Sequence, residues 1–271
     1  LTLDAGPVMM ELKSPWHALP LGIGRNLSTE VAALEALQLV AGVSMPELLL
    51  AASPNFGNYV EDDGEFWGSY GPRVGPQLHS VIQKLTRDPQ TRQAVMTIWN
   101  PATDNVPGKR DYPCTLALGF ELASGSLNMH VTMRSSDVWL GIPYDWFQFT
   151  QLQFTVAKIL NAFPGSYTHT SWSLHLYERN LEAARKLVHE APEQPVRVYQ
   201  PKGIGRFDDG SHEVQRRAGR ILRGQEVGGI TSDEEWYVEQ VRRVRDRLDS
   251  RPEGDVGRDL DRGGAGDRAA E

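Results

Sequence analysis

The sequence has a single cysteine and no long apolar run. One cysteine among 271 residues excludes an internal disulfide and a cysteine-rich metal site. No apolar segment approaches the roughly 20 residues that a membrane-spanning helix needs, and no secretory signal segment opens the sequence. We therefore expect a cytoplasmic protein that has no membrane partner and binds no metal.

Basic residues also do not outnumber acidic residues. The sequence has 28 lysines and arginines against 35 acidic residues, a formal net charge of −7. This balance disfavours a broad basic surface, so no nucleic-acid polymer is expected as a partner. A few converging arginines can still hold a small anion, because a local pocket need not follow the overall charge.

The residues that are present indicate one large α+β domain. With 40% hydrophobic residues the chain can bury a substantial core, and helical and strand-like segments alternate irregularly. We expect a folded domain over residues 1–248 and a disordered tail over residues 249–271, which are polar and glycine-rich. The expected elements are a strand within 1–13, a helix capped by Ser28 and Thr29 and ending near Gly42, a loop over 52–76, helices over 75–86, 146–162, 174–189 and 234–248, a strand over 94–100, and a hairpin over 115–133.

The lone cysteine, Cys114, lies directly before one strand of the expected hairpin. The polar segment that begins at Arg134 follows the other strand, so both should lie at the same rim of the sheet. An arginine there would lower the pKa of the thiol and hold an anionic substrate. The alternative is that Cys114 is a small buried core residue.

Glu35 interrupts a helix that is otherwise apolar on nearly every face. Burial would favour the neutral carboxyl group and raise its pKa, which suits proton transfer to water or substrate. The alternatives are a solvated glutamate, or a structural partner for a buried arginine or backbone donor.

Several separated motifs together resemble the thymidylate synthase family, in consistent order and spacing over roughly residues 1–200. The motifs are Glu35 seven residues before Gly42, Tyr70-Gly71, DPQTR at 88–92 leading to Trp99-Asn100, Pro113-Cys114, RSSDVWLGIPYD at 134–145, and HLY at 175–177. Any one motif alone would be weak, but together and in register they are specific.

The resemblance implies a thymidylate synthase fold, in which a large twisted mixed sheet packs against helices, with residues 1–248 as the catalytic domain. It further implies a homodimer that packs sheet to sheet, in which each subunit lends arginines to the phosphate site of its neighbour. The ligands would be a pyrimidine nucleotide and 5,10-methylenetetrahydrofolate as co-substrate.

The resemblance also implies roles for individual residues. Cys114 would be the nucleophile that attacks carbon 6 of the pyrimidine, and Glu35 the carboxylate that organises water and relays protons. The other implied roles are phosphate binding by Arg134 and Ser135, with Arg92 reaching across from the partner subunit, sugar binding by His175 and Tyr177, substrate contact by Tyr70, and a folate site formed by Asp137, Phe56 and Trp99. Taken singly, His175 and Tyr177 would be packing residues, Arg92 a solvated charge and Asp137 a helix cap.

Asp145 departs from the family pattern, because thymidylate synthases carry an asparagine there that reads uracil. A protonated carboxyl group can donate to cytosine N3 and accept from the 4-amino group. This aspartate resembles that of the cytidylate 5-hydroxymethylase branch of the family. Asp145 could also cap the helix expected from Trp146.

The sequence also departs from the family pattern at the residues expected to surround carbon 5 of the base and at the phosphate site. Phe56 and Tyr59 stand where the family has tryptophans that shield the one-carbon unit for reduction. With these residues in place of the tryptophans, water could reach the one-carbon unit. Glu35 would activate this water, and the product would carry a hydroxymethyl group. Thr115 replaces the usual histidine, and Gln93 replaces a second arginine.

These observations predict transfer of a hydroxymethyl group to carbon 5 of a cytosine nucleotide, CMP rather than dCMP. Lys109 and Arg110 would approach the ribose, unless they are a solvated loop pair. The alternatives are a uridylate methylase or hydroxymethylase, and a nucleotide- or RNA-binding relative without catalytic activity.

Overall fold

The computed structural model describes residues 1–18, 25, 27–190, 200–207 and 209–250. The tail expected over residues 249–271 therefore lies almost wholly outside the described residues. The strands are β1 (Thr2–Asp4), β2 (Val8–Leu12), β3 (Val95–Thr97), β4 (Thr115–Ala123), β5 (Ser126–Met133), β6 (Ser136–Asp137), β7 (Phe163–Ser171) and β8 (Leu174–Tyr177). The α-helices are α1 (Thr29–Ala41), α2 (Pro46–Ala52), α3 (Gly71–Arg87), α4 (Pro101–Asp104), α5 (Gly141–Ile159), α6 (Leu181–Glu190), α7 (Ser211–Leu222) and α8 (Ser232–Asp249), with short 3₁₀ turns η1 (Pro15–His17), η2 (Pro54–Asn58) and η3 (Glu178–Asn180).

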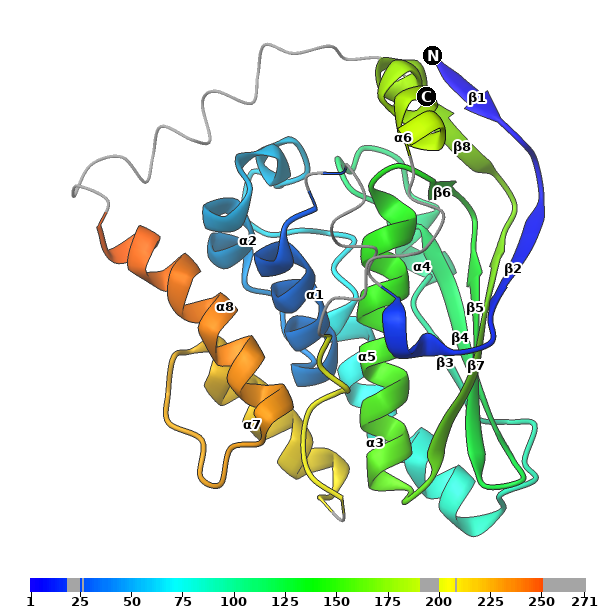
Figure 1. Ribbon diagram of the computed structural model, residues 1–271, viewed down its shortest axis with the longest axis vertical. Coiled ribbons are helices and arrows are strands. Elements are labelled where there is room, and N and C mark those ends of the chain that lie inside the picture. Colours follow the sequence, from blue (N-terminus) through cyan, green and yellow to red (C-terminus); the bar gives the residue numbers. More distant parts are fainter. Residues whose placement is uncertain (19–24, 26, 191–199, 208, 251–271) are drawn as a thin grey trace.

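The described strands form two sheets rather than the single large sheet that we expected. The larger sheet has the order β2-β7-β5-β4-β3 and is mixed, because β5 and β7 run parallel while the other neighbours are antiparallel. The smaller sheet has the order β1-β8-β6. In Figure 1, helices α1, α3 and α5 lie on one face of the larger sheet, and no described helix covers the other face.

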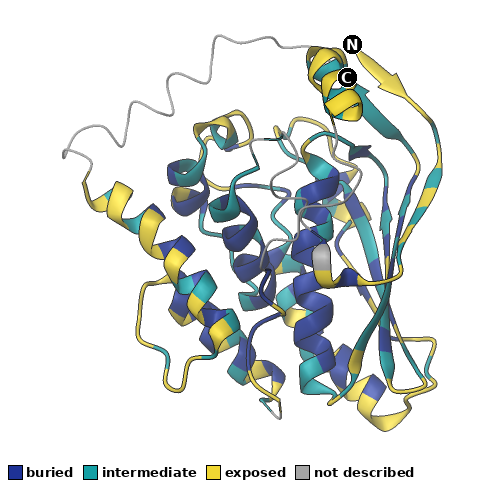
Figure 2. Cartoon of the chain, in the orientation of Figure 1, coloured by how far each residue is buried: buried dark blue, intermediate teal, exposed yellow. Residues whose placement is uncertain are grey.

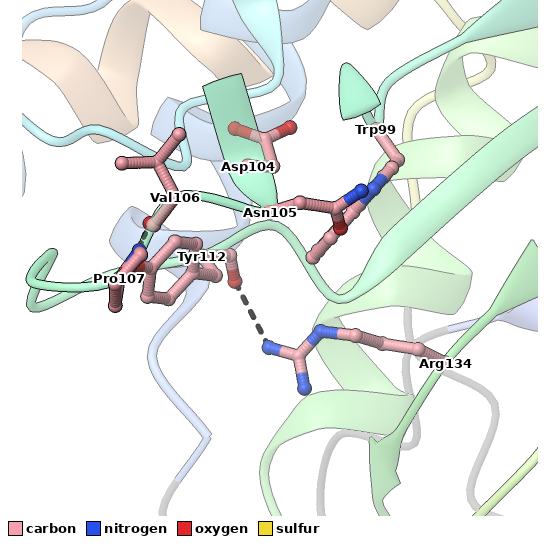
Figure 3. Close-up of a pocket in the computed structure, with 7 residues that line it drawn as sticks. All are labelled: Trp99, Asp104, Asn105, Val106, Pro107, Tyr112 and Arg134. Carbon is pink, nitrogen blue, oxygen red and sulfur yellow. Dashed lines mark hydrogen bonds between the residues drawn. The ribbon is translucent and has the colours of Figure 1, made fainter. Parts of the chain in front are cut away.

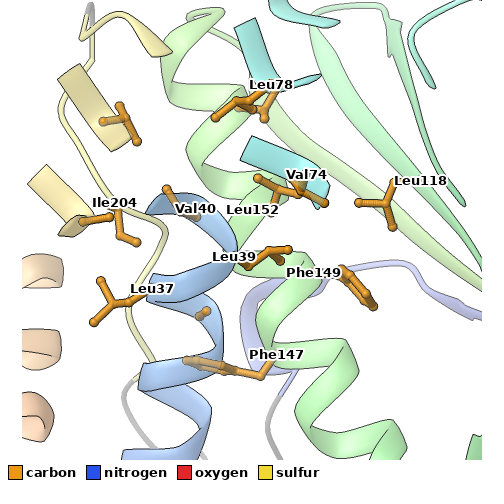
Figure 4. Packing of buried hydrophobic residues seen from close by; sticks show 14 of the residues in the cluster. Leu37, Leu39, Val40, Val74, Leu78, Leu118, Phe147, Phe149, Leu152 and Ile204 are labelled. Atoms are coloured by element: carbon orange, nitrogen blue, oxygen red, sulfur yellow. The ribbon is translucent and has the colours of Figure 1, made fainter. Parts of the chain in front are cut away.

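Helix α1 lies in the centre of the core, between α5 and the C-terminal helices (Figure 4). Its buried residues occupy nearly every face, as expected of a helix surrounded by protein. The Ser28 hydroxyl accepts a hydrogen bond from the Val31 N–H, and Gly42 ends the helix with φ of 74°. The predicted start and end of this helix are confirmed.

The predicted hairpin is also confirmed. β4 and β5 pair in antiparallel register from Ala123 opposite Ser126 to Thr115 opposite Met133. The turn residues Ser124 and Gly125 both have positive φ, which matches the right-handed twist of the two strands.

Three predicted elements have different bounds in the structure. Helix α3 begins at Gly71 rather than near Gly75, because Pro72 occupies the first turn, where its missing N–H is harmless. Helix α5 begins at Gly141, five residues before the predicted start. The predicted helix over 174–189 is β8 followed by α6, because residues 174–177 pair with β1 and β6.

Helices α7 and α8 pack on α1 and complete the domain. Arg217 of α7 is buried against Glu234 of α8, with 2.6 Å between Nη2 and Oε2. The Glu234 carboxylate also accepts the Thr231 N–H in a capping box that starts α8. Figure 2 shows the remaining surface of α8 exposed. None of the helices in the described ranges is long and apolar enough to cross a membrane.

Candidate active site

The hairpin brings Cys114 and Arg134 together at one end of the larger sheet. The Arg134 N–H donates to the Cys114 carbonyl at 2.8 Å, directly beyond the last paired residues of β4 and β5. The shared rim that the sequence predicted for these two residues is therefore present. Cys114 is half-buried and packs against the hydrophobic core.

The guanidinium group of Arg134 is oriented by the segment that precedes Cys114. Its Nε donates to the Pro113 carbonyl at 3.1 Å and its Nη2 to the Tyr112 carbonyl at 3.2 Å. The group also lies 5.9 Å from the centre of the Trp99 ring. Figure 3 shows these side chains around a surface pocket of about 360 Å³, lined by Trp99, Asp104, Asn105, Val106, Pro107, Tyr112 and Arg134. An anion in this pocket would meet the guanidinium group.

Two acids, Glu35 and Asp145, interact electrostatically, and Asp145 also interacts with the thiol. Glu35 on α1 is half-buried as a residue, but its Oε2 is buried and has no hydrogen-bond partner among the described residues. Burial, followed by the negative charge of Asp145, raises the pKa of Glu35 to about 8. Asp145 on α5 is 8% exposed, and burial raises its pKa to about 7 although Gln148 donates to its Oδ1 at 3.2 Å. Both groups can therefore hold a proton near neutral pH.

The pKa of the Cys114 thiol differs from the expectation. Arg134 lowers it as predicted, but burial has the larger effect, and the nearby carboxyl groups of Asp145 and Asp111 also raise it, so it stands at about 11. The thiol of the protein without substrate is therefore protonated at neutral pH.

The smaller sheet carries the predicted sugar-binding residues. β6 and β8 run parallel with Asp137 opposite His175, and the Ser135 hydroxyl lies 3.2 Å from His175 Nδ1. The rings of His175 and Tyr177 meet edge to face at 5.1 Å, and the Arg179 guanidinium lies 4.5 Å from the Tyr177 ring. Ser135, His175 and Tyr177 therefore form one cluster.

Asp137 fixes the turn before α5. Its Oδ1 accepts the Trp139 N–H at 2.9 Å and its Oδ2 accepts the Leu140 N–H at 3.1 Å. These bonds form a turn that precedes the helix. The N-cap residue of α5 is Leu140, and no side chain of the described residues caps it, so the alternative of a helix cap is not confirmed. Each carboxylate oxygen accepts only one of these bonds, so Asp137 retains lone pairs for a ligand.

Two of the predicted site residues, Tyr70 and Phe56, come from the long loop before α3. Tyr70 is half-buried, stacks on Phe149 at 5.9 Å and interacts electrostatically with Cys114 and Asp145. Phe56 packs on Phe66 at 5.9 Å. Both side chains are held by aromatic packing.

Lys109 and Arg110 do not form a free solvated pair. The ammonium group of Lys109 lies 3.9 Å from the centre of the Trp67 ring. Arg110 donates to the Val60 carbonyl and to the exposed carboxylate of Asp62. These contacts hold residues 109 and 110 against the loop that precedes α3.

The subunit places the predicted site residue Arg92 apart from Cys114. It is exposed and precedes β3, which pairs with β4 so that Val95 lies opposite Gly119 and Thr97 opposite Ala117. The chain therefore runs from Cys114 along β4 towards the end of the sheet where Arg92 lies.

Two acids near the site were not singled out from the sequence. Asp104 is buried and accepts bonds from Arg73 and from the Trp67 indole. Asp111 lies three residues before Cys114 and accepts the Gly68 N–H at 3.1 Å. Both partners come from a separate stretch of chain, so local sequence gave no signal of this burial. The described part of the chain contains no group of three or more histidine, cysteine or acidic residues that could hold a metal.

Comparison with known proteins identifies the family. The thymidylate synthase family model matches residues 54–208, which is more than half of the chain, and the protein belongs to this family. The crystal structure of thymidylate synthase from T4 phage superposes with a TM-score of 0.65 over 79% of this chain and 82% of that chain. The two sequences are 20% identical, so this likeness concerns the fold alone.

A curated relative is similar at the sequence level. The deoxyuridylate hydroxymethyltransferase of Bacillus phage SP01 is 35% identical over an alignment of 189 residues, and the match covers 63% of this chain and 49% of the relative. The chain thus spans about half the length of the curated relative that it matches.

Proposed function

We propose that this protein transfers a one-carbon unit from 5,10-methylenetetrahydrofolate to carbon 5 of a cytosine nucleotide, CMP or dCMP, with addition of water. The products are the 5-hydroxymethyl nucleotide and tetrahydrofolate. The observation that carries the proposal is the buried acid Asp145, next to Cys114 and Glu35 in a member of the thymidylate synthase family. The name of the phage relative supports hydroxymethyl transfer over methyl transfer.

Asp145 is the group proposed to read the base. Its pKa of about 7 allows it to carry a proton at neutral pH. The protonated carboxyl group donates to cytosine N3 and accepts from the 4-amino group, which satisfies both polar atoms of that edge. If N3 of cytosine takes the proton, the ionised carboxylate accepts from both groups, and such a carboxylate would leave O4 of uracil without a donor, which would disfavour uracil.

The thiol and the second acid then carry the chemistry. Cys114 adds to carbon 6 as the thiolate, which requires loss of its proton in the substrate complex because its pKa in the free protein is about 11. Arg134 and Ser135 hold the phosphate, and His175 and Tyr177 the sugar. Glu35 organises water and relays protons through its unpaired Oε2.

The folate co-substrate would bind beside the nucleotide. It supplies the one-carbon unit at the oxidation level of formaldehyde. Asp137 has lone pairs left to accept N–H groups of the pterin ring, and Phe56 and Trp99 would supply apolar contacts. No metal is required.

In the dimer that the family resemblance implies, the partner subunit would supply a further cation to the phosphate site. The face of the larger sheet opposite α5 is free of described helices (Figure 1), which suits sheet-to-sheet packing of two subunits. Arg92 would then reach the phosphate site of the neighbouring subunit.

A uracil nucleotide is the second candidate substrate. It is favoured by the name of the phage relative, which acts on deoxyuridylate. A protonated carboxyl group can also pair with uracil, accepting from N3–H and donating to O4. Hydroxymethyl transfer to dUMP is therefore the alternative reaction of the same site.

A four-way competition tests the proposal. CMP, dCMP, UMP and dUMP, each with tritium at carbon 5, are incubated with the protein and methylenetetrahydrofolate. Tritium release identifies the base, and product mass distinguishes methyl from hydroxymethyl. Release from a cytosine nucleotide with a hydroxymethyl product supports the proposal; release from dUMP alone supports the alternative. A Cys114→Ala variant that keeps the biological role would indicate a binding protein without catalytic activity.

A further inference from the structure

Asp111 is a half-buried acid beside the nucleophile that none of the family motifs includes. It lies in the segment 108–114 that leads into β4, three residues before Cys114. Its carboxyl group interacts electrostatically with Cys114, Tyr70 and Tyr59. The carboxyl group therefore lies within electrostatic range of the thiol.

One oxygen of Asp111 is fixed and the other is available. Oδ2 accepts the Gly68 N–H at 3.1 Å, whereas Oδ1 accepts no hydrogen bond from the described residues. A side chain at position 68 would place its Cβ 2.5 Å from Oδ2, so glycine leaves the space that the carboxylate occupies. The carboxylate is thus positioned by one hydrogen bond and keeps a free acceptor for a ligand.

Asp111 contacts the loop that carries the residues expected around carbon 5 of the base. Gly68 lies in the same loop as Phe56 and Tyr59, the residues expected beside the one-carbon unit. Burial raises the pKa of Asp111, as does the nearby acid Glu61, whereas the Gly68 N–H and the guanidinium groups of Arg134 and Arg73 oppose this rise. A carboxylate with a free oxygen therefore lies within electrostatic range of the thiol of Cys114 and of Tyr59.

We propose that Asp111 is the general base that takes a proton from water as the water adds to the one-carbon unit on carbon 5. This inference rests on the proposed function. The water oxygen forms a bond to the exocyclic methylene carbon, and one water proton passes to Asp111. The methylene π electrons move into the ring and then expel the Cys114 thiolate from carbon 6, which restores the ring double bond. No electrons leave or enter the system, so no reductant is needed.

Asp111 suits this step better than Glu35 does. The pKa of Glu35 is about 8, so at neutral pH this group holds a proton and acts as a donor. The charged neighbours of Asp111 are two guanidinium groups and one acid, Glu61, whereas the charged neighbour of Glu35 is the acid Asp145. Asp111 would therefore accept a proton from water, and Glu35 would donate a proton elsewhere on the base.

The test separates one-carbon transfer from hydration in a single turnover. Asp111→Asn keeps the acceptor for the Gly68 N–H but cannot take a proton. With nucleotide tritiated at carbon 5, tritium release in the first turnover should stay within about threefold of wild type. Hydroxymethyl product should fall about 10²–10⁴-fold, and a covalent protein–nucleotide adduct should accumulate in the mass spectrum. Asp111→Ala should regain product formation with added formate.

Two further variants control for position and surface charge. Gly68→Ala displaces the carboxylate and should give the same selective loss of product, while Asp62→Asn, an exposed acid, should behave as wild type. Equal loss of tritium release and product in Asp111→Asn, or unchanged product, would overturn the role of Asp111. If wild type forms no hydroxymethyl nucleotide from any of the four substrates, the proposed function itself is wrong.

Discussion

Replacing Glu35 with glutamine changes how the stability of the protein depends on pH. Burial and the charge of Asp145 raise the pKa of Glu35 from 4.5 to about 8. In the unfolded chain the group therefore ionises at a lower pH than in the folded protein. Between these values the folded state binds one more proton than the unfolded state, so stability is greatest at the acidic end and falls as pH rises towards 8. Glutamine keeps the shape of the side chain and does not titrate.

The magnitude follows from the proton difference. Where a group is protonated in the folded state and ionised in the unfolded state, it changes the free energy of unfolding by about 1.4 kcal/mol per pH unit. Integrated from pH 5 to pH 8, Glu35 should lower the stability of the wild-type protein by about 3–4 kcal/mol relative to the variant. Urea-induced unfolding at intervals of half a pH unit measures both curves. Asp145 also lowers stability as pH rises towards 7, but it is present in both proteins, so the difference between the curves reports Glu35.

Parallel curves for the wild type and Glu35→Gln would refute this reasoning, because Glu35 would then titrate alike in the folded and unfolded states. Glu47 is the matched control. It is exposed on the neighbouring helix α2, and the curve of Glu47→Gln should parallel that of the wild type.

Three further predictions concern the nucleophile, the base and a buried ion pair. Cys114→Ser should lower kcat by a factor on the order of 10⁴–10⁶, measured as tritium release, with nucleotide binding retained. Asp145→Asn should lower kcat/KM for the cytosine nucleotide about 10–100-fold and shift competition towards uracil. Arg217→Met should lower the free energy of unfolding by about 3–5 kcal/mol, measured in urea, because it leaves the fully buried carboxylate of Glu234 without its partner.

Each of these has an outcome that would contradict it. Tritium release by Cys114→Ser at the wild-type rate would exclude the thiol as nucleophile, and an unchanged base preference in Asp145→Asn would remove this acid from base recognition. For the ion pair the control is Glu213→Gln, which breaks an exposed pair with Arg216 and should change stability by about 0.5 kcal/mol or less. Equal effects of the two ion-pair variants would contradict the argument from burial.

Elements with a strong local pattern could be predicted from the sequence, and elements that depend on distant pairing could not. Helix α1 has both a capping serine and a terminal glycine, and the β4–β5 hairpin has alternating strands around a tight turn. Residues 174–177, by contrast, are a strand only because β1 and β6 lie beside them. Helices α2 and α7 were not predicted.

The same distinction applies to the site. The burial of Glu35 follows from the apolar residues of its own helix, and the meeting of Cys114 with Arg134 follows from the hairpin, so both were predictable. Asp111 could not be found in this way, because its burial depends on Gly68 from another stretch of chain. The net pKa of the thiol could not be predicted either, because it depends on the balance between burial and several nearby charges.

That balance can be measured through the reactivity of Cys114 towards iodoacetamide. With a pKa of about 11, the thiolate fraction and the rate of alkylation should rise about tenfold per pH unit up to about pH 10. Asp145→Asn and Asp111→Asn each remove a negative charge that raises this pKa, so both should react faster than wild type above about pH 7, where Asp145 is ionised. Arg134→Gln removes the charge that lowers it and should react more slowly. If all three variants shift the rate in the same direction, the change is one of access to solvent, and the electrostatic description of the site is wrong. If the two aspartate variants react faster and the arginine variant reacts more slowly, the negative charge of Asp145 lowers the thiolate fraction of Cys114. A ligand that keeps Asp145 protonated would then make Cys114 a better nucleophile.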